Sequence, residues 1–178
     1  FDDVRYEVSQ NRTYFEFESE EGPYVSGKKF EEGNHGHRPV AKGGYFPVPP
    51  ADATSDLGGG MLTVMADMGL PIEKHHHEVA PSQHELGIRF DTLVKTADNM
   101  QVYKYVIHNV AHAYGKTATF MPKPVFGENG SGMHVHQSIW RDGKPLFAGT
   151  GYADLSETAL YYIGGTIKHA RAINAFTN

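Results

Sequence analysis

Two histidines and a serine at alternating positions form the first group of residues that could do chemistry. His134, His136 and Ser138 follow a glycine-rich bend that starts at Lys123 and ends at Gly132. Strand side chains alternate between two faces, so these three would point the same way. Main-chain amides in such a bend can bind an anion, and imidazole binds divalent metals. The pattern favours a metal and phosphate site. A hydrogen-bonded core histidine, or a polar strand face turned to water, would leave the same pattern.

A pair of glutamates forms the second such group. Glu78 and Glu85 stand on either side of a Pro-Ser turn, which can bring their carboxylates near one another. Two such anions need a cation between them or a raised pKa on one of them. Glutamates at this spacing are, taken alone, most often surface residues. The run His75–His77 alternates between strand faces, so a three-histidine metal tract is rejected and only His76 is expected on the face of Glu78.

Aromatic and β-branched runs bounded by turn residues predict the strands that would carry these groups. The expected strands are 4–9 with 13–19 as a hairpin, 72–79 with 85–90 around the Pro-Ser turn, 118–121, and 132–140. Residues 141–144 predict a turn. Residues 20–55 have no sustained period. A loop of that length is usually functional or disordered, and its aromatic patches favour a functional loop.

Three helices are expected behind these strands. The first covers residues 56–68 despite Gly58–Gly60, which should weaken its first turn at about 1 kcal/mol per glycine and for which the sequence offers no reason. The second covers 97–114 and ends before Gly115. Its expected buried stripe is Tyr103, Val106, Ile107, Val110, Ala111 and Tyr114. The third begins after Ser156 as N-cap and is expected to bury Leu160, Ile163, Ile167 and Ala170. The predicted class is α+β, with an antiparallel active-site sheet backed by helices.

Composition excludes several classes of protein. The net charge is −5 with the histidines neutral, which argues against a nucleic-acid surface. The absence of cysteine excludes a disulfide framework and a thiolate metal site, and a reducing cytoplasm is the simpler location. The sequence contains no apolar run near the ~20 residues that a membrane span needs, so no membrane association is expected.

Several ordered motifs together resemble one family, the bacterial type I glutamine synthetases. The resemblance covers nearly the whole chain, and several anchors in order are far more specific than any one of them. These anchors are 36–39, 42–47, 76–80, 83–85, 116–124, 129–136, 162–165 and 168–170. Because the family's subunit is much longer, residues 1–178 are expected to be a partial catalytic domain, incomplete at both ends.

The resemblance assigns roles to particular residues. It implies metal ligands at Glu78, Glu85 and His134, glutamate-binding residues at Asn129 and Gly130, and ATP-binding residues at Glu73, Phe90, His136 and Ser138. Other interpretations stay open: Asn129-Gly130 is also a plain turn dipeptide, and Phe90 could be core. Glu73 falls on the opposite strand face from Glu78 unless a bulge intervenes, or it meets the nucleotide at the strand edge. No residue of the segment is assigned as a general acid or base.

The activity implied is ATP-dependent ligation of ammonia to L-glutamate, giving L-glutamine, ADP and phosphate through γ-glutamyl phosphate. The resemblance further implies two divalent ions per site, Mg²⁺ or Mn²⁺, with nitrogen beside carboxylates suiting either. It implies a cytoplasmic dodecamer of two stacked hexameric rings with active sites between subunits. Two alternatives remain open: a γ-glutamyl-polyamine ligase of the same superfamily, and a non-catalytic structural relative in which the metal ligands would have eroded.

Overall fold

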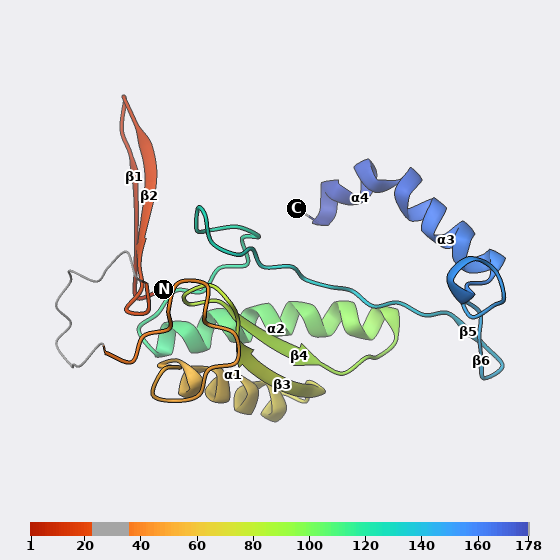
Figure 1. The fold of residues 1–178 in the computed structure, drawn as a ribbon, viewed down its shortest axis with the longest axis horizontal. Coiled ribbons are helices and arrows are strands. Elements are labelled where there is room, and N and C mark those ends of the chain that lie inside the picture. The colour runs from red at the N-terminus through yellow and green to blue at the C-terminus, as the bar shows by residue number, and fades with distance from the viewer. Residues whose placement is uncertain (23–35, 178) are drawn as a thin grey trace. The chain divides into compact units, whose positions relative to one another are not determined.

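A computed structural model describes residues 1–22 and 36–177 of the chain (Figure 1). The chain divides into two compact units, Phe1–Gly132 and Met133–Asn178, which are described separately. Helices and small antiparallel sheets occur together, so the predicted α+β class is confirmed. Among the described residues, no helix has the length and apolar character needed to cross a membrane.

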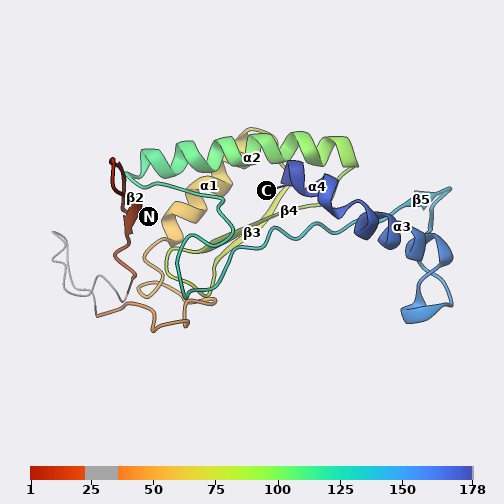
Figure 2. The same cartoon turned by 90° about the horizontal axis from the view of Figure 1, so that it is seen from above.

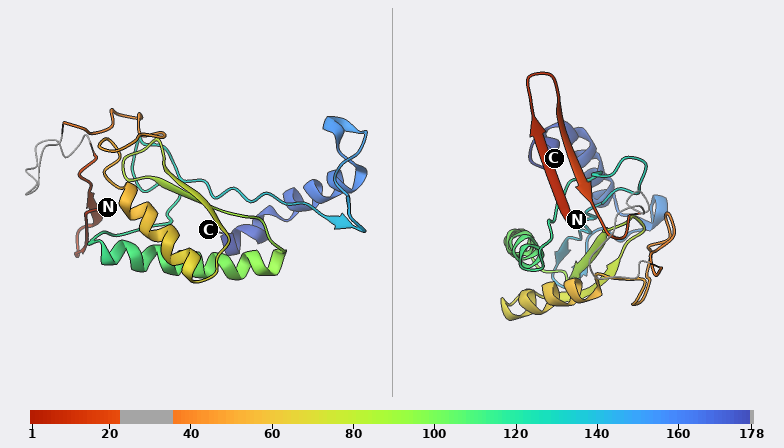
Figure 3. Two further views of the ribbon diagram at one scale, coloured as in Figure 1. Left: turned by 90° about the horizontal axis from the view of Figure 1, so that it is seen from below. Right: turned by 90° about the vertical axis from the view of Figure 1, so that its left-hand side faces the viewer.

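The first unit begins with a β-hairpin, as predicted. Strand β1 (Asp3–Val8) pairs antiparallel with β2 (Thr13–Glu18), and the two form a ribbon of their own, visible in the right-hand view of Figure 3. Tyr6 lies opposite Phe15 in the register. In the turn, the Ser9 amide donates to the Arg12 carbonyl at 2.8 Å. Of the predicted loop over residues 20–55, residues 23–35 lie outside the described part of the chain, and residues 36–54 contain turns but neither helix nor strand.

A second hairpin, backed by two helices, forms the centre of this unit. Strand β3 (Ile72–His77) pairs antiparallel with β4 (His84–Ile88). Helices α1 (Ser55–Asp67) and α2 (Leu93–Ala113) pack against one another, and α1 also packs against both strands. In Figure 2 the two helices lie on one side of the β3–β4 ribbon. This arrangement confirms the predicted antiparallel sheet backed by helices.

The apolar core lies between α1 and α2. It contains Met61, Met65, Leu70, Val106, Ile107, Val110 and Ala111. The predicted stripe of α2 is confirmed for its four central residues, whereas Tyr114 is 48% exposed because it lies past the last helical residue. The helix stops there because Gly115 adopts a left-handed conformation at φ +68°. The amide of Lys116 then reaches back to the Ala111 carbonyl at 2.8 Å.

The glycines of α1 have a packing reason that the sequence did not reveal. A Cβ at Gly58 would stand 2.4 Å from Nδ1 of His75, so the helix can approach strand β3 only without a side chain there. A Cβ at Gly60 would stand 2.8 Å from the hydroxyl of Tyr114. Gly59 has nothing within 4 Å of its Cβ position. The close approach to His75 therefore explains Gly58, whereas the half-exposed Tyr114 side chain could move away from a Cβ at Gly60 and nothing in the structure explains Gly59.

The second unit contains short strands and two helices. Its elements are β5 (Trp140–Arg141), β6 (Lys144–Pro145), the 3-10 turn η2 (Tyr152–Asp154), α3 (Glu157–Lys168) and α4 (Ala170–Thr177). The predicted turn at 141–144 joins β5 to β6. The predicted cap is confirmed, because Oγ of Ser156 accepts from the Ala159 amide at 3.1 Å.

Four expectations about strands, helices and burial were wrong. Residues 118–121 form no strand, and of 132–140 only Trp140 belongs to one. A strand needs a neighbour that accepts its main-chain hydrogen bonds, and among the described residues these segments have no paired partner. The single last helix that was expected is two helices, α3 and α4, and the apolar positions expected to be buried in it are exposed, namely Leu160, Ile163 and Ile167 in α3 and Ala170 in α4. Their helical period is real, but no other described helix or strand of the second unit covers that face.

Candidate functional site

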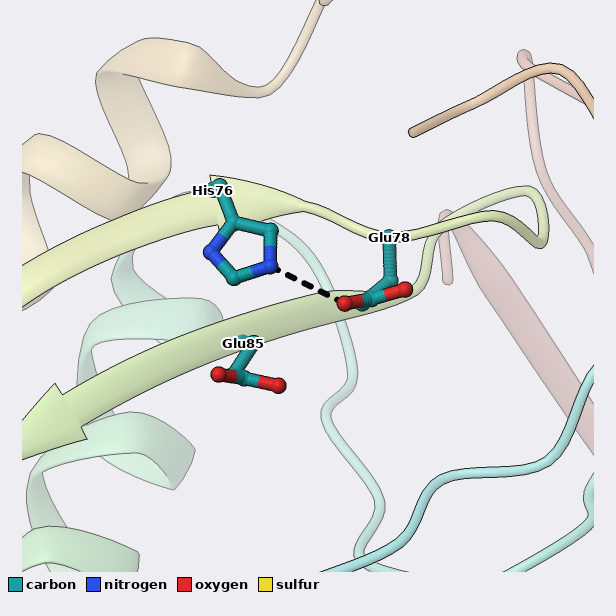
Figure 4. Close-up of side chains that lie close together, drawn as sticks. All are labelled: His76, Glu78 and Glu85. Carbon is teal, nitrogen blue, oxygen red and sulfur yellow. Dashed lines mark hydrogen bonds and ion pairs between the residues drawn. The ribbon is translucent and has the colours of Figure 1, made fainter. Parts of the chain in front are cut away.

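The predicted pairing of two carboxylates is confirmed at the tip of the β3–β4 hairpin. Glu78 directly follows β3 and Glu85 lies on β4 (Figure 4). The amide of Glu78 donates to the Gln83 carbonyl at 2.7 Å, which closes the turn between them. One ligand atom from each glutamate and one from His76 all lie within 4.8 Å of one another. The turn therefore brings two anionic side chains and one imidazole to a single point.

His76 holds the Glu78 carboxylate in place. Its Nε2 lies 2.9 Å from Oε1 of Glu78 (Figure 4), and 7% of its side chain is exposed. The ring of Phe46 stacks on the imidazole at 4.3 Å with an interplanar angle of 5°. A carboxylate can only accept, so Nε2 of His76 donates this hydrogen bond. Sequence reasoning placed His76 on this face but did not include it in the carboxylate cluster.

A tight loop from residues 43 to 46 is hydrogen-bonded to the end of β3. The amides of Gly44 and Phe46 donate to the carbonyls of Val79 and His77, each at 3.2 Å. A Cβ at Gly44 would stand 2.6 Å from the Glu78 carbonyl oxygen, so only glycine allows the approach. This loop belongs to the Lys-Gly-Gly-Tyr-Phe-Pro anchor, and its contact with Glu78 gives that anchor a physical role.

Gln83 connects the carboxylate hairpin to the predicted glutamate-binding residues. Its Nε2 donates to the Gly130 carbonyl at 2.8 Å. The Ser131 amide donates to the Pro122 carbonyl at 2.7 Å, and a Cβ at Gly130 would stand 2.9 Å from that same oxygen. Asn129 and Gly130 therefore lie in a bend whose main chain is fixed to the Glu78–Glu85 turn. Their role toward a substrate stays a prediction.

Two of the predicted ATP-binding residues lie along the same hairpin. The register of β3 shifts between Ile72 and Lys74, so Glu73 lies at a bulge and the bulge expected as one alternative is confirmed. Phe90 lies just past β4 and is 99% exposed, so the interpretation of Phe90 as core is wrong in this chain. Both side chains are free to face a ligand, and their contacts with a nucleotide stay predictions.

The remaining predicted residues belong to the second unit. His134, His136 and Ser138 are exposed and lie in a segment without strand pairing. Oγ of Ser138 accepts from Nε1 of Trp140 at 3.0 Å. Because this segment is described separately from the hairpin, the metal role of His134 and the ATP roles of His136 and Ser138 stay predictions.

A buried polar network beneath the hairpin was missed by sequence reasoning. Nε2 of His77 lies 2.9 Å from Oε2 of Glu21, and the exposed fractions of the two side chains are 0% and 2%. In the same network, the Thr54 hydroxyl donates to Asp52 at 2.9 Å and lies 3.1 Å from Nε2 of His84. Burial, followed by the nearby charge of His77, lowers the pKa of His84 to about 4. The contact between Glu21 and His77 spans 56 residues, and no local pattern signals it.

Comparison with known proteins assigns the family. The model of the protein family described as "Glutamine synthetase, catalytic domain" matches residues 1–178. A glutamine synthetase of Azospirillum brasilense is 74% identical over all of this chain and 38% of its own length. A 3-hydroxylaminophenol mutase of Cupriavidus pinatubonensis is 62% identical over all of this chain and 38% of its own length. The solved Plasmodium falciparum glutamine synthetase matches with a TM-score of 0.85 at 30% identity, covering 99% of this chain and 35% of that one.

The chain belongs to the glutamine synthetase catalytic-domain family. The resemblance drawn from the motifs is therefore confirmed. The chain spans 38% of the length of the curated relatives it matches.

Proposed function

We propose that the whole protein ligates ammonia to L-glutamate at the expense of ATP, and that residues 1–178 supply part of one catalytic domain. The observation that carries this proposal is the Glu78–Glu85 pair, in which two carboxylates converge beside an imidazole in a chain of this family. Intact carboxylates at this point argue against a purely structural relative, in which they would have no reason to be kept together.

The donor set fits a hard divalent cation. Two carboxylates supply oxygen ligands, which Mg²⁺ and Mn²⁺ prefer, and the half-buried position of Glu78 strengthens its attraction for a cation. Glu78 and Glu85 would hold one ion, and His134 would serve the second ion of the proposed pair. When bound, such ions neutralise negative charge on phosphate oxygens, which this acidic chain cannot do alone.

The chain's own residues would hold and align the reactants. The γ-carboxylate of glutamate is a poor electrophile, and transfer of a phosphoryl group to it creates a good leaving group that ammonia can displace. This route passes through γ-glutamyl phosphate and releases ADP and phosphate. The fixed main chain at Gly130 would let the amino-acid substrate approach closely, beside Asn129. Glu73, Phe90, His136 and Ser138 would contact ATP.

The hydrogen bond from His76 would keep the Glu78 carboxylate aligned during these steps. A carboxylate that accepts a hydrogen bond in a fixed direction loses little freedom when a ligand arrives, so less binding free energy is spent on ordering it. None of the described residues is proposed as general acid or base.

The proposed setting is a cytoplasmic homo-oligomer, with two stacked hexameric rings as the expected form and active sites between subunits. The β1–β2 ribbon supports an assembly contact, because Tyr6, Val8 and Phe15 are 71%, 63% and 47% exposed. Apolar side chains that project from one face of a two-stranded ribbon are costly in water unless another surface covers them. The cysteine-free sequence agrees with a reducing compartment.

The test is a substitution of one carboxylate in the whole protein. Glu85→Ala should lower the rate of glutamine formation by about 100-fold or more, since losing a charge-neutralising ion removes several kcal/mol of transition-state stabilisation. Glu16→Ala is the matched control and should leave the rate unchanged, because Glu16 is exposed and lies on the ribbon face opposite Tyr6 and Phe15. Unchanged turnover of Glu85→Ala at saturating Mg²⁺ and Mn²⁺ would contradict the assignment.

A further inference from the structure

Glu21 forms two hydrogen bonds that span the turn between the candidate metal ligands. Its Oε2 accepts from Nε2 of His77 at 2.9 Å and from the Ser82 amide at 2.8 Å. His77 directly precedes Glu78, and Ser82 lies in the turn that leads to Glu85. One buried carboxylate oxygen is therefore fixed to both arms of the hairpin.

The other nitrogen of His77 faces the main chain of the site. Nδ1 lies 2.8 Å from the Gly44 carbonyl oxygen and 2.6 Å from the Glu78 carbonyl oxygen. Both ring nitrogens of His77 thus face hydrogen-bond acceptors of the site. Burial alone lowers the pKa of His77, but the hydrogen bond and charge of Glu21 outweigh it and raise that pKa overall. Burial alone raises the pKa of Glu21, but the hydrogen bond and charge of His77 outweigh it and lower that pKa overall.

The turn itself needs such support. Ser82 adopts a left-handed conformation at φ +58°, which a residue with a side chain rarely takes without help. Its amide is held by Glu21, and its hydroxyl bonds to that of Ser19. Ser19 also accepts from the Glu21 amide at 3.2 Å. The buried residues just after β2, Ser19 and Glu21, therefore support the turn between Glu78 and Glu85.

We propose that Glu21 and His77 are positioning residues, which hold Glu78 and Glu85 at the separation that a divalent cation needs. The inference rests on the proposed function in taking these two glutamates as metal ligands. The two carboxylates repel one another, so an unsupported turn would let them move apart when no cation is bound. Glu21 and His77 touch no candidate ligand atom and act through the main chain of the turn. Partners of this kind typically change metal affinity 10- to 100-fold when altered.

The test measures Mn²⁺ binding to the whole protein by the EPR signal of free Mn²⁺, without relying on activity. Only the Mn²⁺-binding sites that are lost in Glu85→Ala are compared between variants. Glu21→Gln keeps the size of the side chain and an oxygen for the Ser82 amide, but it removes the charge that holds His77. We expect it to weaken these sites about 10- to 100-fold. We expect Glu16→Gln, an equal change of charge at an exposed position, to bind within about twofold of the unaltered protein.

Steady-state kinetics distinguish positioning from general damage. Glu21→Gln should raise the Mn²⁺ concentration for half-maximal activity about as much as it raises the dissociation constant, while activity at saturating Mn²⁺ returns to within a few-fold. His77→Gln can still donate to Glu21, whereas His77→Asn can still donate to the two carbonyls. Each should lose part of the affinity, and combining either with Glu21→Gln should add less than the sum of the separate losses.

Several outcomes would overturn the proposal. If the unaltered protein forms glutamine and Glu21→Gln binds Mn²⁺ as tightly as it does, the positioning role alone is rejected. If Glu21→Gln does not fold, His77→Asn is judged by the same thresholds. Failure of both to fold would also reject it, because the pair would then serve global stability. If the unaltered protein forms no glutamine but Glu21→Gln still weakens Mn²⁺ binding, the proposed function is rejected and the positioning role stands.

Discussion

An alanine at Gly58 is expected to destabilise the protein, whereas an alanine at Gly59 is expected to stabilise it. The two glycines are neighbours in α1, so both changes gain the same helix propensity, about 1 kcal/mol. Their surroundings differ. A Cβ at Gly58 would stand 2.4 Å from Nδ1 of His75 and 2.7 Å from its Cε1, whereas a Cβ at Gly59 meets nothing within 4 Å.

The size of the difference follows from the packing. Forcing a methyl group against a side chain on the packed face typically costs about 1–3 kcal/mol, because α1 or β3 must shift. Since the propensity gain is common to both variants, Gly58→Ala should be less stable than Gly59→Ala by about 1–3 kcal/mol. Because His75 is next to His76, Gly58→Ala should also weaken Mn²⁺ binding at the Glu78–Glu85 pair.

Urea unfolding of the whole protein, followed by circular dichroism, measures the difference in free energy of unfolding. Equal stability of the two alanine variants would refute the packing of His75 against α1. A stabilised Gly58→Ala would refute it too, because the close approach of helix and strand would then not need a glycine.

Two further predictions concern a half-buried histidine and a helix N-cap. The pKa of His84 is lowered from an ordinary 6.5 to about 4, so the unfolded chain binds the extra proton between these values and stability falls as the pH drops from 6.5 to 4. His84→Gln, which keeps a donor for Thr54, should remove up to about 3 kcal/mol of this loss, measured by urea unfolding at pH 7 and pH 4. Ser156→Ala should lower the stability of the second unit by about 1 kcal/mol in thermal unfolding, and Ser156→Asp, which restores a cap, should not.

The elements that carry the candidate site could be predicted because their signals are local. Alternation of side chains around a Pro-Ser turn was enough to place Glu78 and Glu85 near one another. The same alternation separated His76 from His75 and His77. The cap at Ser156 and the stop at Gly115 depend on the chemistry of one or two residues, and both were found.

The features that could not be predicted depend on contacts between distant segments. The hydrogen bond between Glu21 and His77 joins residues 56 apart, and Glu21 in the sequence is one of several acidic residues in a polar run. Gly58 is explained only by where His75 lies. Residues 132–140 have the alternation of a strand, but whether they pair depends on a neighbour that the pattern does not contain. The exposed face of α3 shows the same limit, since periodicity predicts an apolar face but not what covers it.

The most direct test of the central claim follows the oxygen of the γ-carboxylate. The whole protein would be incubated with ATP, L-glutamate labelled with ¹⁸O in its γ-carboxylate, and either ammonia or putrescine at equal concentration. We expect glutamine to form with ammonia, with one ¹⁸O transferred to the released phosphate for each glutamine, because the carboxylate oxygen leaves with the phosphoryl group. Putrescine should support far less product. Unlabelled phosphate would contradict the acyl-phosphate route, and preference for putrescine would contradict the identity of the acceptor.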